Sequence, residues 1–192
     1  MKPTEQLFGQ GVRRSKDKDT RRYNLLAARL IADLIKNSLG PCGMEKMFID
    51  VLGEVTVTKD GATLLRKLDI EHPAAKVLIE ASNAVDNEVG DGTTSVVVLA
   101  GALLEKAEQL LDRGISPSII VDGYLKGLEI SLKTLEDIAR ISKNSDREIM
   151  ERLATTSLRS KMISYTISKQ NNVAAKLVVD AICTITDFAN NQ

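Results

Sequence analysis

The chain has 192 residues, 43% of them hydrophobic and 27% charged, which suits one domain with a sizeable core, or one domain plus part of another. Basic and acidic residues balance at 26 each, so we expect no general attraction to nucleic acid or to an anionic membrane, and a charged ligand must be held by a local site. Cys42 and Cys183 lack metal-ligand spacing and no apolar stretch approaches the roughly 18 residues of a membrane span, so we expect a soluble, cytoplasmic protein without a zinc site, disulfide scaffold or membrane segment.

The first predicted element is a helix that follows a charged arm. The arm, RRSKDKDTRR from Arg13 to Arg22, mixes both charges without helical periodicity, which is typical of a solvated segment; a nucleic-acid-binding tail is the less favoured alternative. With Thr20 as N-cap, apolar residues then recur at helical spacing, namely Leu26, Leu30, Ile31, Leu34 and Ile35. The pattern stops at SLGPCG, where Gly40 can adopt a positive φ and Pro41 cannot continue a helix, so we expect the helix to end at the glycine.

A β-hairpin and another helix are expected next. The β-favouring runs KMFID (46–50) and EVTVT (54–58) are separated by VLG, which is the pattern of a hairpin with a glycine in its turn. Helical spacing resumes after the KDG of residues 59–61. The fold class predicted from these patterns is mainly α, with one small hairpin.

Three long helices follow in series. Pro73 suits the first turn of one helix, Thr93 opens the next, and Ser116 followed by Pro117 starts the third. The expected bounds are 73–87, 93–113 with Gly114 as the stop, and 117–141. We interpret the apolar faces of the last two helices as surfaces that pack on each other; the residues are Val97, Leu104 and Leu111 on one helix and Ile120, Leu128, Leu132 and Leu135 on the other.

A domain boundary is predicted near Asn144. The polar segment KNSDRE contains a capping box, Ser145 with Glu148 three residues later, which marks the start of a new helical unit. The helices expected beyond the boundary cover 146–158 and 173–188, and this part is too short to bury a full core of its own. We therefore divide the chain into a mainly helical domain, 1–144, and the first part of another domain, 145–192.

The run GDGTT at residues 90–94 is the first candidate for chemistry. It opens a helix, and the first N–H groups of a helix carry partial positive charge and lack an intrahelical partner, which together suit phosphate. The threonine hydroxyls add donors, and the glycines allow the backbone to approach closely. Asp91 cannot hold a phosphate, but it can hold a magnesium ion that bridges to phosphate oxygens. The alternative is a plain helix cap beside a glycine turn, and by spacing alone it is at least as favoured.

Two other segments favour the nucleotide site over the plain cap. SLGPCG (38–43) ends a helix in bare or rigid backbone, and TKDGAT (58–63) places Lys59 and Asp60 at a turn beside a strand. Folded together with GDGTT, these segments would supply donors, a cation and a second carboxylate. Neither a Walker A motif nor a complete G-x-G-x-x-G is present, so an ordinary P-loop or Rossmann site is excluded.

Four segments, in this order and spacing, resemble the equatorial ATP-binding domain of group II chaperonins. They are SLGPCGMEKM, VTVTKDGATLL, IEHPAAKVLIEAS and EVGDGTTSVVVLAG, and the resemblance runs from about Leu7 to about Ile182. The eukaryotic cytosolic branch looks closest, with an alpha-type subunit favoured by FG near the start and TTSLRSKMIS later; an archaeal thermosome subunit is the near alternative. The resemblance implies an equatorial helical bundle with a hairpin over 1–144 and the first segment of an intermediate domain over 145–192.

The resemblance also implies roles for single residues. Asp91 would be the magnesium ligand, and Asp60 would be catalytic, because it would orient the attacking water. Lys59 departs from the asparagine that is commoner in group II chaperonins; it would either contact phosphate or be a plain surface lysine at a turn. Ser160 and Lys161 resemble the family's nucleotide-sensing loop. The other nucleotide contacts would come from Leu39, Gly40, Pro41, Gly92, Thr93, Thr94 and Ser95.

The function implied by the resemblance is that of an ATP-dependent chaperone subunit. Such a subunit binds Mg-ATP and packs with like or unlike subunits into a double ring, in which the hairpin and the terminal arm pair with neighbours. The apical domain that grips unfolded clients and the returning C-terminal halves are absent from this sequence, so hydrolysis is expected only within a complete ring. The alternative is a truncated, non-catalytic interaction protein that docks on chaperonin subunits. We expect no nucleic-acid or membrane partner.

Overall fold

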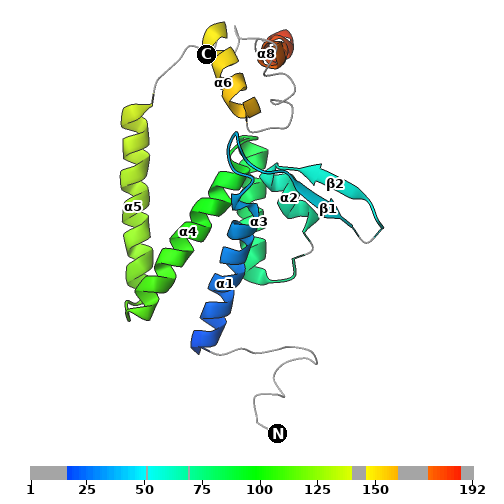
Figure 1. Ribbon diagram of the computed structural model, residues 1–192. Coiled ribbons are helices and arrows are strands. Elements are labelled where there is room, and N and C mark those ends of the chain that lie inside the picture. Colours follow the sequence, from blue (N-terminus) through cyan, green and yellow to red (C-terminus); the bar gives the residue numbers. More distant parts are fainter. Residues whose placement is uncertain (1–16, 51, 69, 140–145, 160–172, 187–192) are drawn as a thin grey trace.

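The computed structural model describes residues 17–50, 52–68, 70–139, 146–159 and 173–186. These residues are mainly helical and include one two-stranded antiparallel sheet, which confirms the predicted fold class (Figure 1). The elements in chain order are α1 (Asp17–Lys36), β1 (Lys46–Ile49), β2 (Val55–Thr58), α2 (Gly61–Lys67), α3 (Pro73–Glu88), α4 (Thr93–Asp112), α5 (Pro117–Ile138), α6 (Arg147–Arg159) and α8 (Val173–Ile185).

The hydrophobic core lies where α1, α2, α3 and α4 meet. α1 and α4 are antiparallel, because Arg22 near the start of α1 pairs with Asp112 at the end of α4, Nη2 to Oδ1 3.4 Å. The two helices come so close at Gly101 that a Cβ there would lie 2.2 Å from the Cβ of Ala32. The end of α1 and the start of α4 therefore lie at the same end of the core. Its buried residues are Ala28, Ile31, Ala32, Ile35, Leu64, Leu65, Ala75, Leu78 and Val97.

α1 differs from its prediction at both ends. It begins at Asp17, so Thr20 lies inside the helix and the prediction of an N-cap there is wrong. Helical periodicity marks where a helix has an apolar face, and a polar first turn escapes it. At the other end α1 stops at Lys36, and Gly40 lies four residues further on in a turn, with a φ of +83° that glycine adopts most readily.

β1 and β2 form the predicted hairpin. In its antiparallel register Phe48 pairs with Thr56, and Phe48 packs against the core. The other face of the hairpin exposes four apolar side chains, namely Met47, Ile49, Val55 and Val57. Within the described residues no third strand joins either edge. An apolar face beside open strand edges is typical of a surface that meets a partner.

The three long helices start where the sequence predicts. His72 is the N-cap of α3, and its Nδ1 accepts a hydrogen bond from the N–H of Ala74 at 3.2 Å. α4 begins at Thr93 and ends one residue before the predicted Arg113, with Gly114 in the left-handed region at φ +85°. α5 begins at Pro117 and ends three residues before the predicted position. Proline and the capping residues therefore located the helix starts correctly.

The predicted packing of α4 on α5 is largely wrong. Val97 and Leu104 of α4 pack in the core with α1, α2 and α3, so this face is not available to α5. α5 meets α4 near its own beginning, where Ile120 is buried and the hydroxyl of Tyr124 donates to the Leu103 carbonyl at 2.5 Å. Beyond that point the two helices diverge (Figure 1). The remaining predicted contact residues of α5 are exposed, namely Leu128, Leu132 and Leu135.

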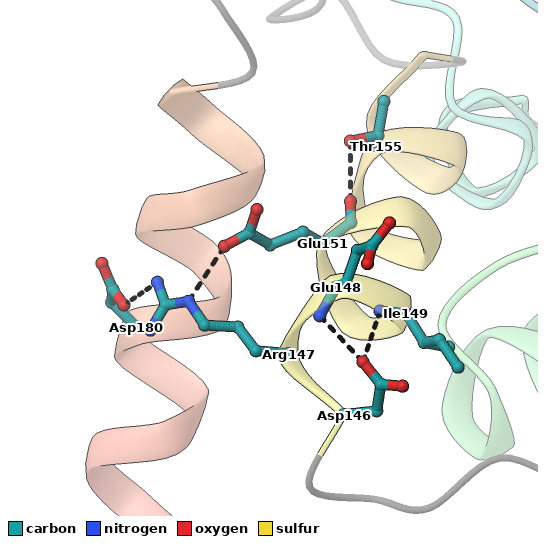
Figure 2. Close-up of polar contacts among 7 residues, drawn as sticks. All are labelled: Asp146, Arg147, Glu148, Ile149, Glu151, Thr155 and Asp180. Atoms are coloured by element: carbon teal, nitrogen blue, oxygen red, sulfur yellow. Dashed lines mark hydrogen bonds and ion pairs between the residues drawn. The ribbon is translucent and has the colours of Figure 1, made fainter.

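α6 and α8 pack against each other, with Ala175 and Val179 of α8 buried. Arg147, the first residue of α6, points across to Asp180 of α8 and along its own helix to Glu151 (Figure 2). Its Nη2 lies 2.5 Å from Oδ1 of Asp180, and its Nε lies 2.9 Å from Oε1 of Glu151. Hydrogen bonding to Asp180, and then to Glu151, raises the pKa of the already strongly basic Arg147 guanidinium.

The cap of α6 is Asp146, one residue after the predicted Ser145. Oδ1 of Asp146 accepts hydrogen bonds from the N–H groups of Glu148 at 3.1 Å and Ile149 at 3.3 Å (Figure 2). Asp146 is therefore the cap, because it directly precedes α6 and its carboxylate accepts from the N–H groups two and three residues further on. Ser145 lies outside the described residues, and the carboxylate of Glu148 pairs with Arg152 at 2.5 Å.

Candidate functional site

The loop before α4 exposes one carboxylate between two glycines. Gly90 has φ +73° and Gly92 has φ +82°, so both residues use a backbone conformation that other residues rarely adopt. Asp91 is exposed, and its Oδ1 accepts a hydrogen bond from the N–H of Gly92 at 2.8 Å. Within the described part of the chain its Oδ2 has no partner. The loop therefore presents a carboxylate oxygen to solvent at the positive end of a 20-residue helix.

The first turn of α4 is anchored on its inner side and open on its outer side. Thr93 is 4% exposed, and its carbonyl accepts a hydrogen bond of 3.2 Å from the hydroxyl of the fully buried Ser82 of α3. Thr94 is half-buried, and Ser95 is exposed. Of the three predicted hydroxyl donors, only that of Ser95 lies on a fully exposed residue.

Asp60 is held in a fixed position as the N-cap of α2. Its Oδ2 accepts hydrogen bonds from the N–H of Thr63 at 3.1 Å and from the Thr63 hydroxyl at 2.9 Å. Its own N–H donates to the hydroxyl of Thr58 at 3.1 Å. The predicted catalytic carboxylate is thus also a structural residue, and the cap fixes its orientation.

The KDG turn and the GDGTT loop, which are 30 residues apart in sequence, are in contact. A Cβ built on Gly61 would lie 2.4 Å from Oγ1 of Thr94 and 2.8 Å from its backbone N. Since Asp60 precedes Gly61 directly, its backbone lies one residue from the first turn of α4. The structure therefore brings together two of the three segments that the sequence singled out.

The turn with Leu39, Gly40 and Pro41 lies at the same end of the core. It follows the end of α1, which the antiparallel pairing places beside the start of α4. The turn is tight, because the N–H of Gly43 donates to the Gly40 carbonyl at 3.0 Å. Next to it the hydroxyl of Ser38 is buried and lacks a partner among the described residues. Most buried hydroxyls are hydrogen-bonded, so Ser38 is an exception at this end of the core.

Other predicted site residues are only partly placed. Lys59 is half-buried between β2 and Asp60, and it makes no ion pair with another described residue. Ser160 and Lys161 lie outside the described residues. Gly61 and Ser82 were missed by the sequence analysis. A signal existed for Ser82, because it is a serine at the helical spacing of the buried Ala75 and Leu78.

Several further observations limit the chemistry of the described residues. A cavity of about 220 Å³ lies at the opposite end of α1 and α4, so it is separate from the candidate site; it is lined by Arg21, Arg22, Leu25, Glu108, Leu111 and Asp112. Among the described residues, no three histidine, cysteine, aspartate or glutamate side chains converge to hold a metal, and both cysteines are free and exposed. Nor does any described helix have the length and apolarity to span a bilayer.

Comparison with known proteins identifies relatives over nearly the whole chain. The model of the TCP-1/cpn60 chaperonin family matches residues 31–192. The thermosome alpha subunit of Aeropyrum pernix is 46% identical over 181 residues, which cover 94% of this chain and 32% of that protein. The thermosome beta subunit of Archaeoglobus fulgidus is 45% identical over 186 residues, or 97% of this chain and 33% of that protein.

The thermosome alpha subunit of Saccharolobus solfataricus gives the same result, with 45% identity over 94% of this chain and 33% of that subunit. The chain thus spans about a third of the length of the curated relatives it matches. These relatives confirm the resemblance to group II chaperonins; all three are thermosome subunits, the alternative that the sequence analysis placed beside the eukaryotic branch. The chain belongs to the TCP-1/cpn60 chaperonin family, in its group II branch.

Proposed function

We propose that this chain binds Mg-ATP at the start of α4, as the nucleotide-binding part of an ATP-dependent chaperone subunit. The observation that carries the proposal is the contact between Gly61 and Thr94, because it joins a fixed carboxylate, Asp60, to an open helix N-terminus. One triphosphate could then meet both segments, with the phosphates near the N–H groups of α4 and the reacting end near Asp60.

Magnesium fits this donor set. The ion commonly takes one or two protein carboxylates and fills its other positions with phosphate oxygens and water. Asp91 offers one exposed carboxylate with a free oxygen, beside glycines that let the phosphates come close. Bound there, the ion would neutralise phosphate charge. Gly92, Thr93, Thr94 and Ser95 would hold the phosphates, mainly through backbone N–H groups, because the Thr93 side chain is buried.

The other residues of the proposed site would have separate roles. Asp60 would orient the attacking water, and its capping contacts with Thr63 would keep the carboxylate in one orientation. Lys59 would contact phosphate, since its ammonium has no carboxylate partner in the described part of the chain. Leu39, Gly40 and Pro41 would contact the phosphates of the nucleotide. Ser160 and Lys161 would act as the nucleotide sensor.

The proposal extends to a ring of subunits. The thermosome subunits are about three times as long as the matched segment, so hydrolysis and the folding of unfolded clients are proposed for a complete subunit in a double ring. The exposed apolar face of the hairpin supports pairing with a neighbouring subunit. We place this function in the cytoplasm, where free thiols such as Cys42 and Cys183 persist.

Calorimetric titration of the chain with ATP tests the proposal. We expect binding that requires magnesium and that weakens by about tenfold or more in Asp91→Ala, because a direct charged contact to the metal is lost. Asp122→Ala, which removes an exposed carboxylate of α5, is the matched control and should bind like the unmodified chain. Absence of binding at millimolar ATP and magnesium would contradict the proposal.

A second candidate is a non-catalytic interaction protein that docks on chaperonin subunits. It is favoured by the extent of exposed apolar surface on the hairpin and α5, which exceeds the scattered exposure usual on a monomer. Sizing of a cell extract separates the two candidates. Migration with a large ring particle that does not change with nucleotide, together with no ATP binding by the purified chain, would favour the second.

A further inference from the structure

We propose that Gly61 and Ser82 are positioning residues of the nucleotide site, which together hold Asp60 against the first turn of α4. This inference rests on the nucleotide binding proposed above and concerns the same site. Neither residue needs to touch the nucleotide. Their effect is on the spacing between the capped carboxylate and the helix start that would receive the phosphates.

Gly61 sets the spacing from the α2 side. It is the first residue of α2 and is buried. Alanine is the better helix former, so a glycine here calls for a packing reason. The reason is Thr94, because a Cβ on Gly61 would lie 2.4 Å from its Oγ1, 2.8 Å from its N and 3.0 Å from its Cα. Two of these atoms are backbone and cannot rotate away, so any side chain would push the two segments apart.

Ser82 sets the spacing from the α3 side. Its side chain is fully buried, and its hydroxyl donates to the carbonyl of Thr93 at 3.2 Å. That bond fixes the residue next to Thr94, from the face opposite to solvent. The start of α4 is thus tied to α3 at one residue and in contact with α2 at the next. Asp60, which precedes Gly61, and Asp91, which lies two residues before Thr93, are thereby held in fixed positions relative to each other.

The test is a double-mutant cycle on Mg-ATP affinity, measured by calorimetry on the full chain well below its melting temperature. Gly61→Ala should weaken Mg-ATP binding by about tenfold or more, because a Cβ there would displace the first turn of α4, whose N–H groups would hold the phosphates. Gly61 and Ser82 act on the same turn, so the loss in the double variant Gly61→Ala, Ser82→Ala should be smaller than the sum of the two single losses. Ser82→Ala should act in the same direction, several-fold.

Two controls separate positioning from stability. Gly123→Ala places a Cβ in open space on α5 and should leave affinity unchanged. Ala107→Gly, at a buried position near the far end of α4, should lower the melting temperature but leave the affinity of the folded chain unchanged. A merely structural role for Gly61 would give the same pattern as Ala107→Gly.

The outcomes are distinct. Folded Gly61→Ala that binds Mg-ATP like the unmodified chain overturns this inference, and so does a loss that adds fully to that of Ser82→Ala. If Gly61→Ala does not fold, Ser82→Ala decides: unchanged Mg-ATP affinity in that variant overturns the inference. No binding by the unmodified chain would overturn the proposed function and this inference with it.

Discussion

Asp60 illustrates how one side chain can serve the fold and the site at once. Its Oδ2 holds both the N–H and the hydroxyl of Thr63, and the next residue in the chain touches the start of α4. A capping carboxylate loses orientational freedom, and this is also what a group that positions a water molecule requires. Stability and chemistry can therefore be tested separately at this residue.

We predict that Asp60→Ala destabilises the chain by about 1 kcal/mol, because α2 loses its N-cap. Urea unfolding followed by circular dichroism measures the change. Asp122→Ala, on the exposed side of α5, should change stability by less than about 0.5 kcal/mol. Equal stability of the two variants would show that the bonds to Thr63 contribute nothing net to the fold.

At the residue scale, the sequence predicted what depends on neighbours along the chain. Asp91 between Gly90 and Gly92 is one example, since flanking glycines and a following helical pattern are visible locally. Gly61 was not predicted to matter, because the reason for its lack of a side chain is Thr94, which is 33 residues away. Contacts between distant segments decide such roles, and one sequence does not display them.

At the scale of elements, burial separates helices that look alike in sequence. α2 and α5 both carry several apolar residues, yet Leu64 of α2 is fully buried and Leu128 of α5 is 53% exposed. The prediction for α5 failed because Val97 and Leu104 of α4 pack in the core with residues of α1, α2 and α3. Amphipathic periodicity says that a helix has a face to bury, and it leaves the partner open.

We predict that Leu64→Ala destabilises the chain by about 2–5 kcal/mol, since it leaves a cavity in the core. Leu128→Ala should cost less than about 1 kcal/mol, because over half of that side chain is already in water. Midpoints and slopes from urea unfolding of the two variants give the comparison. A similar cost for both would mean that α5 is packed in solution.

The α6–α8 pair supplies a second prediction at this scale. Arg147→Ala removes contacts to Asp180 and Glu151, but the side chains of Arg147 and Asp180 are more than half exposed to water. The expected loss of stability is small, and it should shrink in molar salt because exposed ion pairs are screened. Because the pKa of Arg147 is raised, stability from this group would be lost only at very alkaline pH, so the loss should not vary between pH 6 and 9. Unfolding at two salt concentrations and several pH values checks this.

At the scale of the whole molecule, the described residues form one well-packed region and several apolar surfaces without cover. The hairpin exposes Met47, Ile49, Val55 and Val57, and α5 exposes most of its aliphatic residues. Surfaces of this extent are usual where a chain meets other chains or other parts of its own chain. This chain spans about a third of its relatives' length, which is compatible with either a neighbouring chain or another part of the same chain covering these surfaces.

The hydrogen bond from the Tyr124 hydroxyl to the Leu103 carbonyl has a consequence for how cooperatively the chain unfolds. α5 is joined to the rest of the described structure at that bond and at the buried Ile120, and the roughly four turns beyond Tyr124 have little to hold them. Backbone amides of α5 beyond Tyr124 should therefore exchange with deuterium through local fraying, while those in the middle of α1 and α4 exchange only on global unfolding. Mass spectrometry of exchanged peptides would reveal the gradient, and uniform protection along both helices would mean that α5 unfolds together with the core.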